Sequence, residues 1–257
     1  MIKTPHPDSG AILREAARRV SPWSRRLFLR NALGLGTLTA LAGCDVVDGI
    51  SAEGMLAQVS DFNDRVQAWL FNPNRLAREY PESMITRPFP FNSFYVPNTP
   101  EKAPTIDPAR WALNVTGRVE RQDDWRLADL ARLPQVTQIT RHICIEGWSA
   151  IGKFTGVRFS VFLQAVGADL SARYVTFRCD DNYVTSIDMA TALHPQTQLT
   201  LGFDGGALPR EHGFPLKLRV PTKLGFKNPK HIGEIAVGDD YTGGYWETYG
   251  YNWFSGL

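Results

Sequence analysis

Cysteine is scarce in this chain: three of its 257 residues are cysteines, at positions 44, 144 and 179. Three are too few for a scaffold built on disulfides, and no Cys-x-x-Cys-His signature of a covalently attached haem occurs. They are also too few for an iron–sulfur cluster, and no Cys-x-x-Cys or His-x-x-x-His pair is present to supply the remaining ligands of a zinc site. The sequence therefore offers none of the common cysteine-based motifs.

Regular long-range patterns are also lacking. The chain has no internal repeat, no steady alternation of strands with helices, and no Gly-x-Gly-x-x-Gly motif after an expected strand. Its composition is otherwise ordinary, with 43% hydrophobic and 21% charged residues. These values exclude a collagen-like, low-complexity or mostly disordered chain, and the length fits one large domain or two small ones.

The net charge of +2 is unevenly distributed. Residues 1–43 contain seven Lys/Arg and two acidic residues, so residues 44–257 contain 21 basic and 24 acidic residues, a net of −3. The body of the protein therefore has no overall electrostatic attraction to nucleic acid, which we do not expect as a partner.

The N-terminal segment has the pattern of an export signal. Arg25 and Arg26 precede Phe28-Leu29, and an apolar stretch over 31–43 follows. This stretch is too short to span roughly 30 Å of hydrocarbon as a helix. A basic region before a short apolar core is typical of a signal peptide, and the paired arginines resemble a twin-arginine signal. An ordinary amphipathic helix is the alternative. We expect export to the periplasm by the twin-arginine route, whose cargo often acquires a cofactor before export.

The end of this segment, Leu41-Ala42-Gly43-Cys44, also resembles a lipobox. In that interpretation Cys44 becomes the lipidated N-terminus, and its acyl chains anchor the body to a bilayer. The alternative is that Cys44 is an incidental apolar residue beside a conventional cleavage site.

The next region predicts one helix and a long ordered coil. Apolar residues at helical spacing favour a helix over 55–71, ending before Pro73. Seven prolines over 81–108 exclude regular helix and central sheet. We expect an extended coil that wraps the domain, because its aromatic residues favour burial: Phe89, Phe91, Phe94 and Tyr95.

From residue 110 onward the elements are short and mostly strands. Helices are predicted over 127–133 and 160–167, the second with Ser160 as N-cap and Gly167 at its end. Strands are predicted over 111–119, 136–145, 174–179, 183–187, 199–203 and 216–220, with turns at 180–182 and 204–206. This order predicts an α+β fold with a large β component.

The first candidate for chemistry is the sequence from Arg141 to Trp148, which contains Cys144. A cysteine at a strand end beside a glycine can be a metal thiolate, a nucleophile, half of a disulfide or a buried apolar residue. The flanking Arg141 and His142 would favour the thiolate. A disulfide to Cys179 and a hydrolase using Cys144 with His142 are both left open, although no third residue orients the histidine.

The second candidate is the run from Arg210 to His231, which contains six Lys/Arg and two His against one acid. Lys217 and Arg219 fall on one face of the strand over 216–220 and its apolar residues on the other. Such a cluster can hold an anion, most naturally a phosphate, with help from the glycine loop. A solvated strand face is the alternative. A third segment holds Asn92 and Tyr95, which could bind a ligand or merely pack the coil.

Together and in this order, these segments resemble the molybdopterin domain of the sulfite oxidase family. The similarity extends to its bacterial periplasmic branch, which includes the catalytic subunit of the methionine sulfoxide reductase system. Residues 85–257 carry the resemblance, through three stretches: Asn92–Tyr95, Arg141–Trp148 and His212–Lys230. It implies a mixed, β-rich molybdopterin-binding fold in a single domain.

The resemblance also implies roles for individual residues. Cys144 would be the catalytic cysteine and the protein thiolate on molybdenum. His212, Lys217 and Lys230, with the backbone of Asn228, would hold the pterin phosphate and its neighbours. The remaining cofactor-lining residues would be Asn92, Tyr95 and Cys179.

The implied function is that of an exported, molybdenum-molybdopterin-dependent oxidoreductase that transfers an oxygen atom. Its small-molecule substrate would be an S- or N-oxide or a sulfite-like anion, bound by Arg141 or Arg158 if it is anionic. A separate redox partner, a membrane haem protein, would exchange the electrons. We expect a monomer with a signal peptide at 1–43, a helix and linker at 44–84 and the oxidoreductase domain at 85–257. The alternative is an exported anion-binding module with a Cys144–Cys179 disulfide.

Overall fold

The computed structural model describes residues 62–63, 66–67, 69–70, 72, 75–95 and 97–257. The signal segment and Cys44 lie outside these residues. Residues 62–63, 66–67 and 69–70 are helical, as the sequence predicts for this part of the 55–71 helix. No helix in the described part of the chain is both long enough and apolar enough to cross a membrane.

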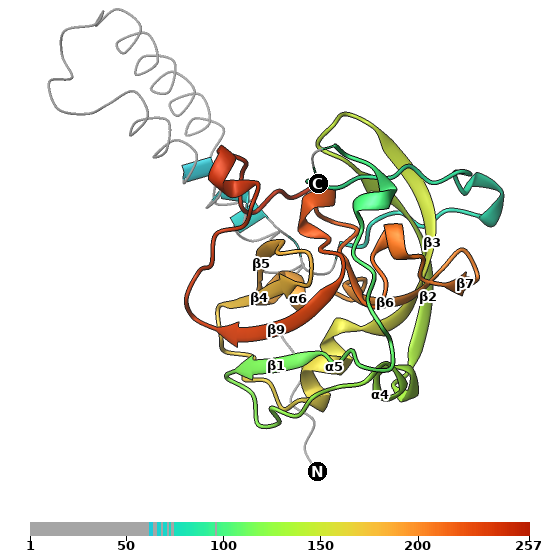
Figure 1. The fold of residues 1–257 in the computed structure, drawn as a ribbon. Coiled ribbons are helices and arrows are strands. Elements are labelled where there is room, and N and C mark those ends of the chain that lie inside the picture. Colours follow the sequence, from blue (N-terminus) through green and yellow to red (C-terminus); the bar gives the residue numbers. More distant parts are fainter. Residues whose placement is uncertain (1–61, 64–65, 68, 71, 73–74, 96) are drawn as a thin grey trace, which may run out of the picture. The chain divides into compact units, whose positions relative to one another are not determined.

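The described elements are short (Figure 1). The α-helices are α4 (Leu127–Arg132), α5 (Phe159–Ala165) and α6 (Met189–Ala192). The 3-10 helices are η1 (Glu82–Met84), η2 (Pro100–Lys102), η3 (Arg210–His212), η4 (Gly225–Lys227) and η5 (Glu247–Tyr249). The strands are β1 (Asn114–Gly117), β2 (Gln135–Ile143), β3 (Ser149–Arg158), β4 (Tyr174–Cys179), β5 (Val184–Asp188), β6 (Gln198–Phe203), β7 (Gly206–Ala207), β8 (Lys217–Arg219) and β9 (Ile232–Gly238).

The strands form two sheets. One has the order β1-β9-β4-β5, in which only the β1–β9 pair is parallel. The other is antiparallel, with β2-β3-β6-β7 in order and β8 paired to β6. This mixed, strand-rich arrangement with few helices confirms the predicted α+β class.

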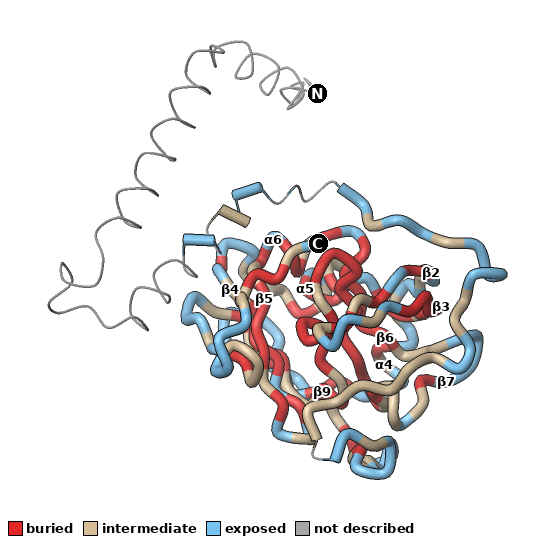
Figure 2. The backbone as a smooth tube through the Cα atoms, turned by 90° about the horizontal axis from the view of Figure 1, so that it is seen from above, coloured by how far each residue is buried: buried red, intermediate tan, exposed pale blue. Residues whose placement is uncertain are grey.

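One hydrophobic core joins the two sheets. It includes Val115, Phe177 and Ile235 from the first sheet and side chains of β3, β6 and β8 from the second, together with α4 and α5. Figure 2 shows buried tube through much of β3 and β4 and exposed tube in several connections, whereas the connection between β8 and β9 is itself buried. Because β8 is covered on both faces, its polar residues as well as Leu218 are buried.

The coil over 81–108 is ordered where it is described, as predicted. Tyr80 donates its N–H to Ile139 O at 3.0 Å and Thr86 donates to Ile151 O at 2.9 Å, so the start of the coil runs beside β2 and β3. Its aromatic residues from Phe89 to Tyr95 are partly buried.

The sequence prediction is wrong at one helix cap and misses several elements. The N-cap of α5 is Arg158, with no side-chain cap, and not Ser160, because β3 continues directly into the helix. The strands β3, β7 and β9 and the short helix α6 are absent from the prediction. Gly167 does close α5, with a positive φ of 62°.

Candidate functional site

The tip of β2 carries Cys144 into a cavity that is partly open to solvent, here called the cysteine cavity. Cys144 N–H donates to Trp148 O at 2.9 Å and Gly147 N–H donates to Cys144 O at 3.3 Å, so the chain turns back at once into β3. Gly147 has a φ of +90°, which favours glycine at this turn. The cavity is lined by residues 92–95, 144–146, 181, 183, 225, 226, 228–230 and 246.

The electrostatics around Cys144 differ from the expectation. Burial raises the pKa of the Cys144 thiol, backbone N–H groups of the turn oppose this, and the carboxylate of Glu146 raises it further. Its Sγ lies 3.8 Å from Glu146 Oε2. Arg141 is exposed, and its guanidinium carbon lies over the Tyr80 ring, 5.3 Å from the ring centroid. The flanking residues therefore do not favour the free thiolate, and that prediction is wrong.

A second, smaller cavity adjoins the first through two shared residues, Asn92 and Lys230. We call it the cationic cavity, since His142, His212, Lys217 and Lys230 line it with three aromatic rings. His142 is fully buried, and its Nε2 has no hydrogen-bond partner among the described residues. Burial and the nearby cations hold the pKa of His142 well below its usual range, so this imidazole is neutral.

No carboxylate is among the described residues that line the cationic cavity, although Asp181 and Glu211 act on Lys230 from nearby. Lys217 is 5% exposed and donates only to the backbone oxygen of Asn228, at 3.3 Å. Lys230 donates to the backbone oxygens of Asn92 at 2.5 Å and Glu211 at 2.9 Å. No carboxylate forms a salt bridge with either lysine in the described part of the chain.

The pKa values in this cavity reflect that missing partner. Burial lowers the pKa of Lys217 well below its usual range and that of Lys230 to about 8. Burial and the two lysines lower the pKa of His212 to about 4. Buried cations without a counter-ion are costly, so the arrangement suits an anion that enters the cavity.

Arg219 connects the two cavities structurally. This fully buried guanidinium donates to Asn228 Oδ1 at 2.8 Å, to Thr140 Oγ1 at 3.2 Å and to Arg141 O at 2.6 Å. Asn228 Oδ1 also accepts the N–H of Val220 at 2.8 Å. One residue of β8 thus fixes both the loop that contains Asn228 and the end of β2 that carries Cys144.

Gly225 leaves room for this arrangement. A Cβ at this position would lie 2.6 Å from His142 Nε2 and 3.2 Å from Ile143 O. Gly225 also lines the cysteine cavity. The glycine of the loop therefore allows the backbone of η4 to approach the end of β2 closely.

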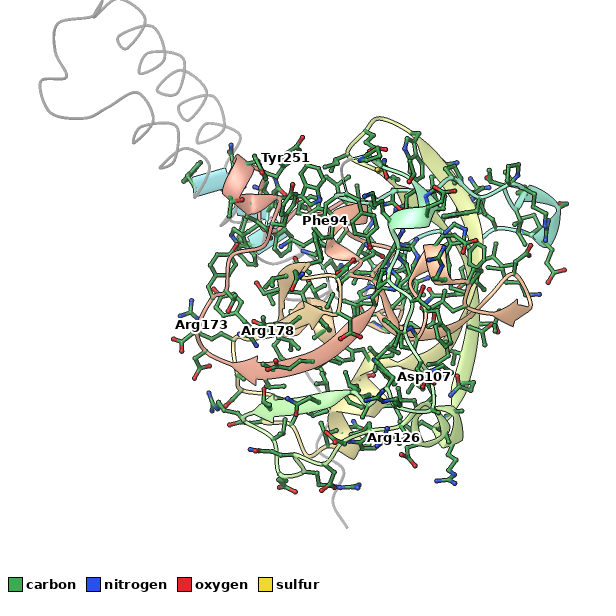
Figure 3. The ribbon with its side chains drawn as sticks, viewed as in Figure 1. Phe94, Asp107, Arg126, Arg173, Arg178 and Tyr251 are labelled. Atoms are coloured by element: carbon green, nitrogen blue, oxygen red, sulfur yellow. The ribbon has the colours of Figure 1, made fainter. Side chains whose placement is uncertain are left out.

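Aromatic side chains form part of the wall of the cysteine cavity. Phe94, labelled in Figure 3, contacts the rings of Tyr95, Tyr183 and Tyr245 with centroids 4.9 to 5.2 Å apart. Tyr183 donates its hydroxyl to Phe226 O at 2.7 Å, and Trp246 completes the lining. The wall combines apolar surface with a few oriented polar groups, as ligand pockets do.

The structure brings together most of the residues that the sequence singles out. Asn92, Tyr95, Cys144, Asn228 and Lys230 line the cysteine cavity, and Asn92, His212, Lys217 and Lys230 line the cationic one. Lys217 and Arg219 are buried, so the alternative of a solvated strand face is wrong.

The two described cysteines are not bonded to each other, and the two arginines suggested for substrate binding lie outside both cavities. Cys144 and Cys179 are both free thiols, so the disulfide required by the binding-module alternative is absent. Cys179 is buried at the end of β4 but is not among the residues that line either cavity. Arg141 and Arg158 are exposed and do not line the cavities either.

The residues of the cysteine cavity that sequence reasoning misses include Glu146, Asp181 and Trp246. Glu146 accepts a hydrogen bond from Trp148 Nε1 at 2.8 Å and follows the cysteine by two residues, a proximity that could have drawn attention to it. The sequence places Asp181 only in a turn. Nothing in the local sequence distinguishes Trp246 from its aromatic neighbours.

Comparison with known proteins gives consistent results. A family model described as the oxidoreductase molybdopterin binding domain matches residues 100–246. The "Putative protein-methionine-sulfoxide reductase subunit YedZ1" of Azospira oryzae is 55% identical over 249 residues, covering 95% of this chain and 94% of that protein. The protein-methionine-sulfoxide reductase catalytic subunit MsrP of Ralstonia nicotianae is 31% identical, covering 60% of this chain and 55% of that protein.

Among solved structures, the crystal structure of the sulfane dehydrogenase SoxCD from Paracoccus pantotrophus is similar in fold. The TM-score is 0.51 at 22% sequence identity, and the match covers 54% of this chain and 40% of that one.

Proposed function

Because this chain belongs to the oxidoreductase molybdopterin binding domain family, we propose that its two cavities bind molybdenum-molybdopterin and that the enzyme reduces sulfoxides. The chain is a molybdopterin oxidoreductase by family. The finer assignments of substrate, residues and partner are our proposal.

The observation that supports the proposal most strongly is the cluster of buried basic side chains that line the cationic cavity. Lys217 and Lys230 lie there without a carboxylate partner among the described residues, beside His212 and the unpartnered Nε2 of His142. A phosphate group would supply the missing negative charge and hydrogen-bond acceptors. These residues fit the charged tail of the pterin, with Asn92 and Tyr95 along its length.

Cys144 fits a metal ligand better than a free nucleophile. Its thiol has a raised pKa, so it is protonated at neutral pH unless a cation binds it. A bound metal removes the proton from a coordinating thiol, and a soft thiolate suits a redox-active molybdenum centre. When bound, the cofactor supplies two-electron oxygen-atom transfer. Arg219 fixes the end of β2 and so orients Cys144 for that role.

The lining of the cysteine cavity favours a neutral substrate. Two carboxylates, Glu146 and Asp181, face one cation, Lys230, and no arginine is among the lining residues. A sulfite-like anion would meet net negative charge there, whereas a sulfoxide is neutral and has an apolar flank for the aromatic wall. The names of the MsrP relative and the Azospira relative support the same substrate class.

The N-terminal sequence motifs support a proposal for where the protein is located, and the family resemblance supports one for its electron donor. We propose export by the twin-arginine signal at 1–43, with a linker at 44–84 and the oxidoreductase domain at 85–257. Cys44 would carry a lipid anchor at the membrane, where a haem protein would deliver electrons one at a time. Cys179 lies outside both linings, so it would not contact the pterin directly but would support residues that do.

The experiment is metal analysis of the full chain purified from a host that exports it, with wild type, Lys217→Met and the exposed control Lys102→Met. Wild type and the control should contain stoichiometric molybdenum. Lys217→Met should lose about tenfold or more in loading. The cofactor-free Lys217→Met protein should be no less stable than wild type, since removing an unpaired buried charge is not costly.

Cys144→Ser tests the second half of the proposal. This variant should remain folded but should not reduce methionine sulfoxide with a dye as electron donor. Wild-type turnover in Cys144→Ser would remove the metal-ligand role, and full molybdenum loading of Lys217→Met would show that the cationic cavity serves another ligand.

A further inference from the structure

The cysteine cavity contains a hydrogen-bonded pair of side chains, one of which, Asp181, has no role in the proposed cofactor site. Tyr95 Oη donates to Asp181 Oδ2 at 2.7 Å, and both residues line the cavity together with Cys144. They are 86 positions apart in the chain, one on the extended coil and one on the turn between β4 and β5. The pair therefore exists only because the fold brings these two segments to the same wall.

The turn holds the carboxyl group firmly. Asp181 Oδ1 accepts the N–H of Tyr183 at 3.1 Å. Asn182 takes a positive φ of 67° and donates its N–H to Cys179 O at 2.9 Å. Asp180, the preceding residue, donates its N–H to His231 O at 2.8 Å. Asp181 is thus directed into the cavity, whereas Asp180 is not among the lining residues.

The surroundings keep a proton available at this pair. Burial raises the pKa of Asp181, although Tyr95 and Lys230 oppose the shift. Burial and the Asp181 hydrogen bond raise the pKa of Tyr95 far above its usual range, so its hydroxyl stays protonated. The titratable and charged groups that interact with Asp181 are Tyr95 on the coil, Cys179 and Asp180 on β4 and its turn, Tyr183, and Lys230.

Sulfoxide reduction needs a source of protons. The balanced reaction is R₂S=O + 2 e⁻ + 2 H⁺ → R₂S + H₂O: the S–O bond breaks, sulfur is reduced and the oxygen leaves as water. The two electrons come from the one-electron donor through the cofactor. The two protons must reach the oxygen inside a cavity whose lining includes five aromatic residues.

We propose that Tyr95 and Asp181 form the proton relay of this reaction, an inference that rests on the proposed function. Tyr95 is the catalytic residue that gives its hydroxyl proton to the departing oxygen, and Asp181 is the positioning residue that replaces this proton. Asp181, which is partly exposed, is then protonated again from solvent. With Asp181 ionised, the tyrosine hydroxyl points to the carboxylate, as in the structure. With Asp181 protonated, the carboxyl donates to Tyr95, whose proton turns to the substrate.

The test compares pH profiles of molybdenum-loaded full-length protein reducing methionine sulfoxide with a dye donor. The variants are wild type, Asp181→Asn, Tyr95→Phe and the neighbouring-carboxyl control Asp180→Asn. Wild-type kcat should fall as pH rises through the raised pKa of Asp181. Asp181→Asn and Tyr95→Phe should be slower by about 100-fold. Both should lose this alkaline fall when kcat is expressed per bound molybdenum, and Asp180→Asn should keep the fall.

A second measurement is independent of turnover. Infrared titration of the loaded resting enzyme should show a protonated-carboxyl band that persists above the ordinary pKa of aspartate and is missing in Asp181→Asn. An Asp181→Asn enzyme with the wild-type rate and pH profile would overturn the relay while leaving sulfoxide reduction intact. Loaded wild-type enzyme that does not reduce methionine sulfoxide would instead overturn the proposed function and the relay together.

Discussion

Buried histidines link the stability of this domain to pH. His231 has a positive φ of 54°, its Nδ1 lies 2.7 Å from Phe214 O, and its Nε2 is buried without a partner among the described residues. Burial lowers its pKa to about 4, below the value of about 6.5 expected in the unfolded chain. The unfolded chain therefore binds more protons between these values, and stability is lost as pH falls through that window.

Replacing this histidine should remove part of that dependence. Asparagine tolerates a positive φ, so His231→Asn keeps the backbone conformation. In urea unfolding of cofactor-free protein between about pH 4 and 6.5, the variant should lose a slope of up to about 1.4 kcal/mol per pH unit. A slope equal to that of wild type would show that His231 does not stay neutral in the fold.

At the scale of elements, two glycines of β3 allow neighbouring groups to pack closely against this strand. A Cβ at Gly156 would lie 1.9 Å from Leu199 O, at the point where the β3–β6 register shifts between Thr155 and Gly156. A Cβ at Gly152 would meet the rings of Phe154 and Phe89 at 2.8 to 2.9 Å. Close approach of a neighbouring strand and of aromatic rings therefore requires small residues here.

Gly156→Ala should destabilise the fold by about 3 kcal/mol, because the added methyl group separates β3 from β6. The matched control is Gly206→Ala at the hairpin, where the nearest atom to a new Cβ is 3.9 Å away. The control should change stability by no more than about 0.5 kcal/mol. Thermal unfolding measures both, and equal stability of the two variants would contradict the assigned register.

These glycines also explain why some strands escape prediction from the sequence. The strands β2, β4, β5 and β6 follow clear alternation or turn signals, and their predicted ranges are nearly correct at both ends. In β3, Gly152 and Gly156 interrupt the pattern, and they are required by neighbours that are remote in the sequence. β9 is similar, since a Cβ at Gly233 would lie 2.5 Å from the side-chain oxygen Oδ1 of Asp180.

At the scale of the whole molecule, a buried ion pair connects the C-terminal segment to the loop of the site. Lys227 of η4 is 1% exposed and donates to Glu247, whose side chain is 8% exposed, and to Ser186 O at 3.0 Å. Glu247 is adjacent to Trp246, which lines the cysteine cavity. The pair therefore holds the aromatic wall against the loop that carries Asn228.

Removing either partner should leave a buried charge unpaired. Lys227→Met and Glu247→Leu should each cost about 3–5 kcal/mol, whereas the double variant should cost clearly less than their sum. Lys153→Met, which breaks a surface pair with Glu82, should cost at most about 1 kcal/mol. Denaturant unfolding of the full double-mutant cycle measures the coupling, and additive costs would exclude a direct interaction.

The site, like the fold, can be predicted from the sequence only where the pattern is local. The sequence indicates the types of residue that hold an anion and a soft metal, because Cys144 and the basic run are locally distinctive. It cannot indicate that Asp181 and Trp246 face Cys144, since those pairings depend on long-range packing. It also suggests that Arg141 acts on the cysteine, whereas the fold directs that side chain to Tyr80.

Arg219 has a consequence for the order of events in the life of the protein. Its guanidinium binds Asn228 and the backbone of Arg141 at once, so the two ends of the site stabilise each other. A chain that has not yet been synthesised beyond Asn228 lacks this connection. We therefore expect the proposed cofactor to bind after the domain has folded.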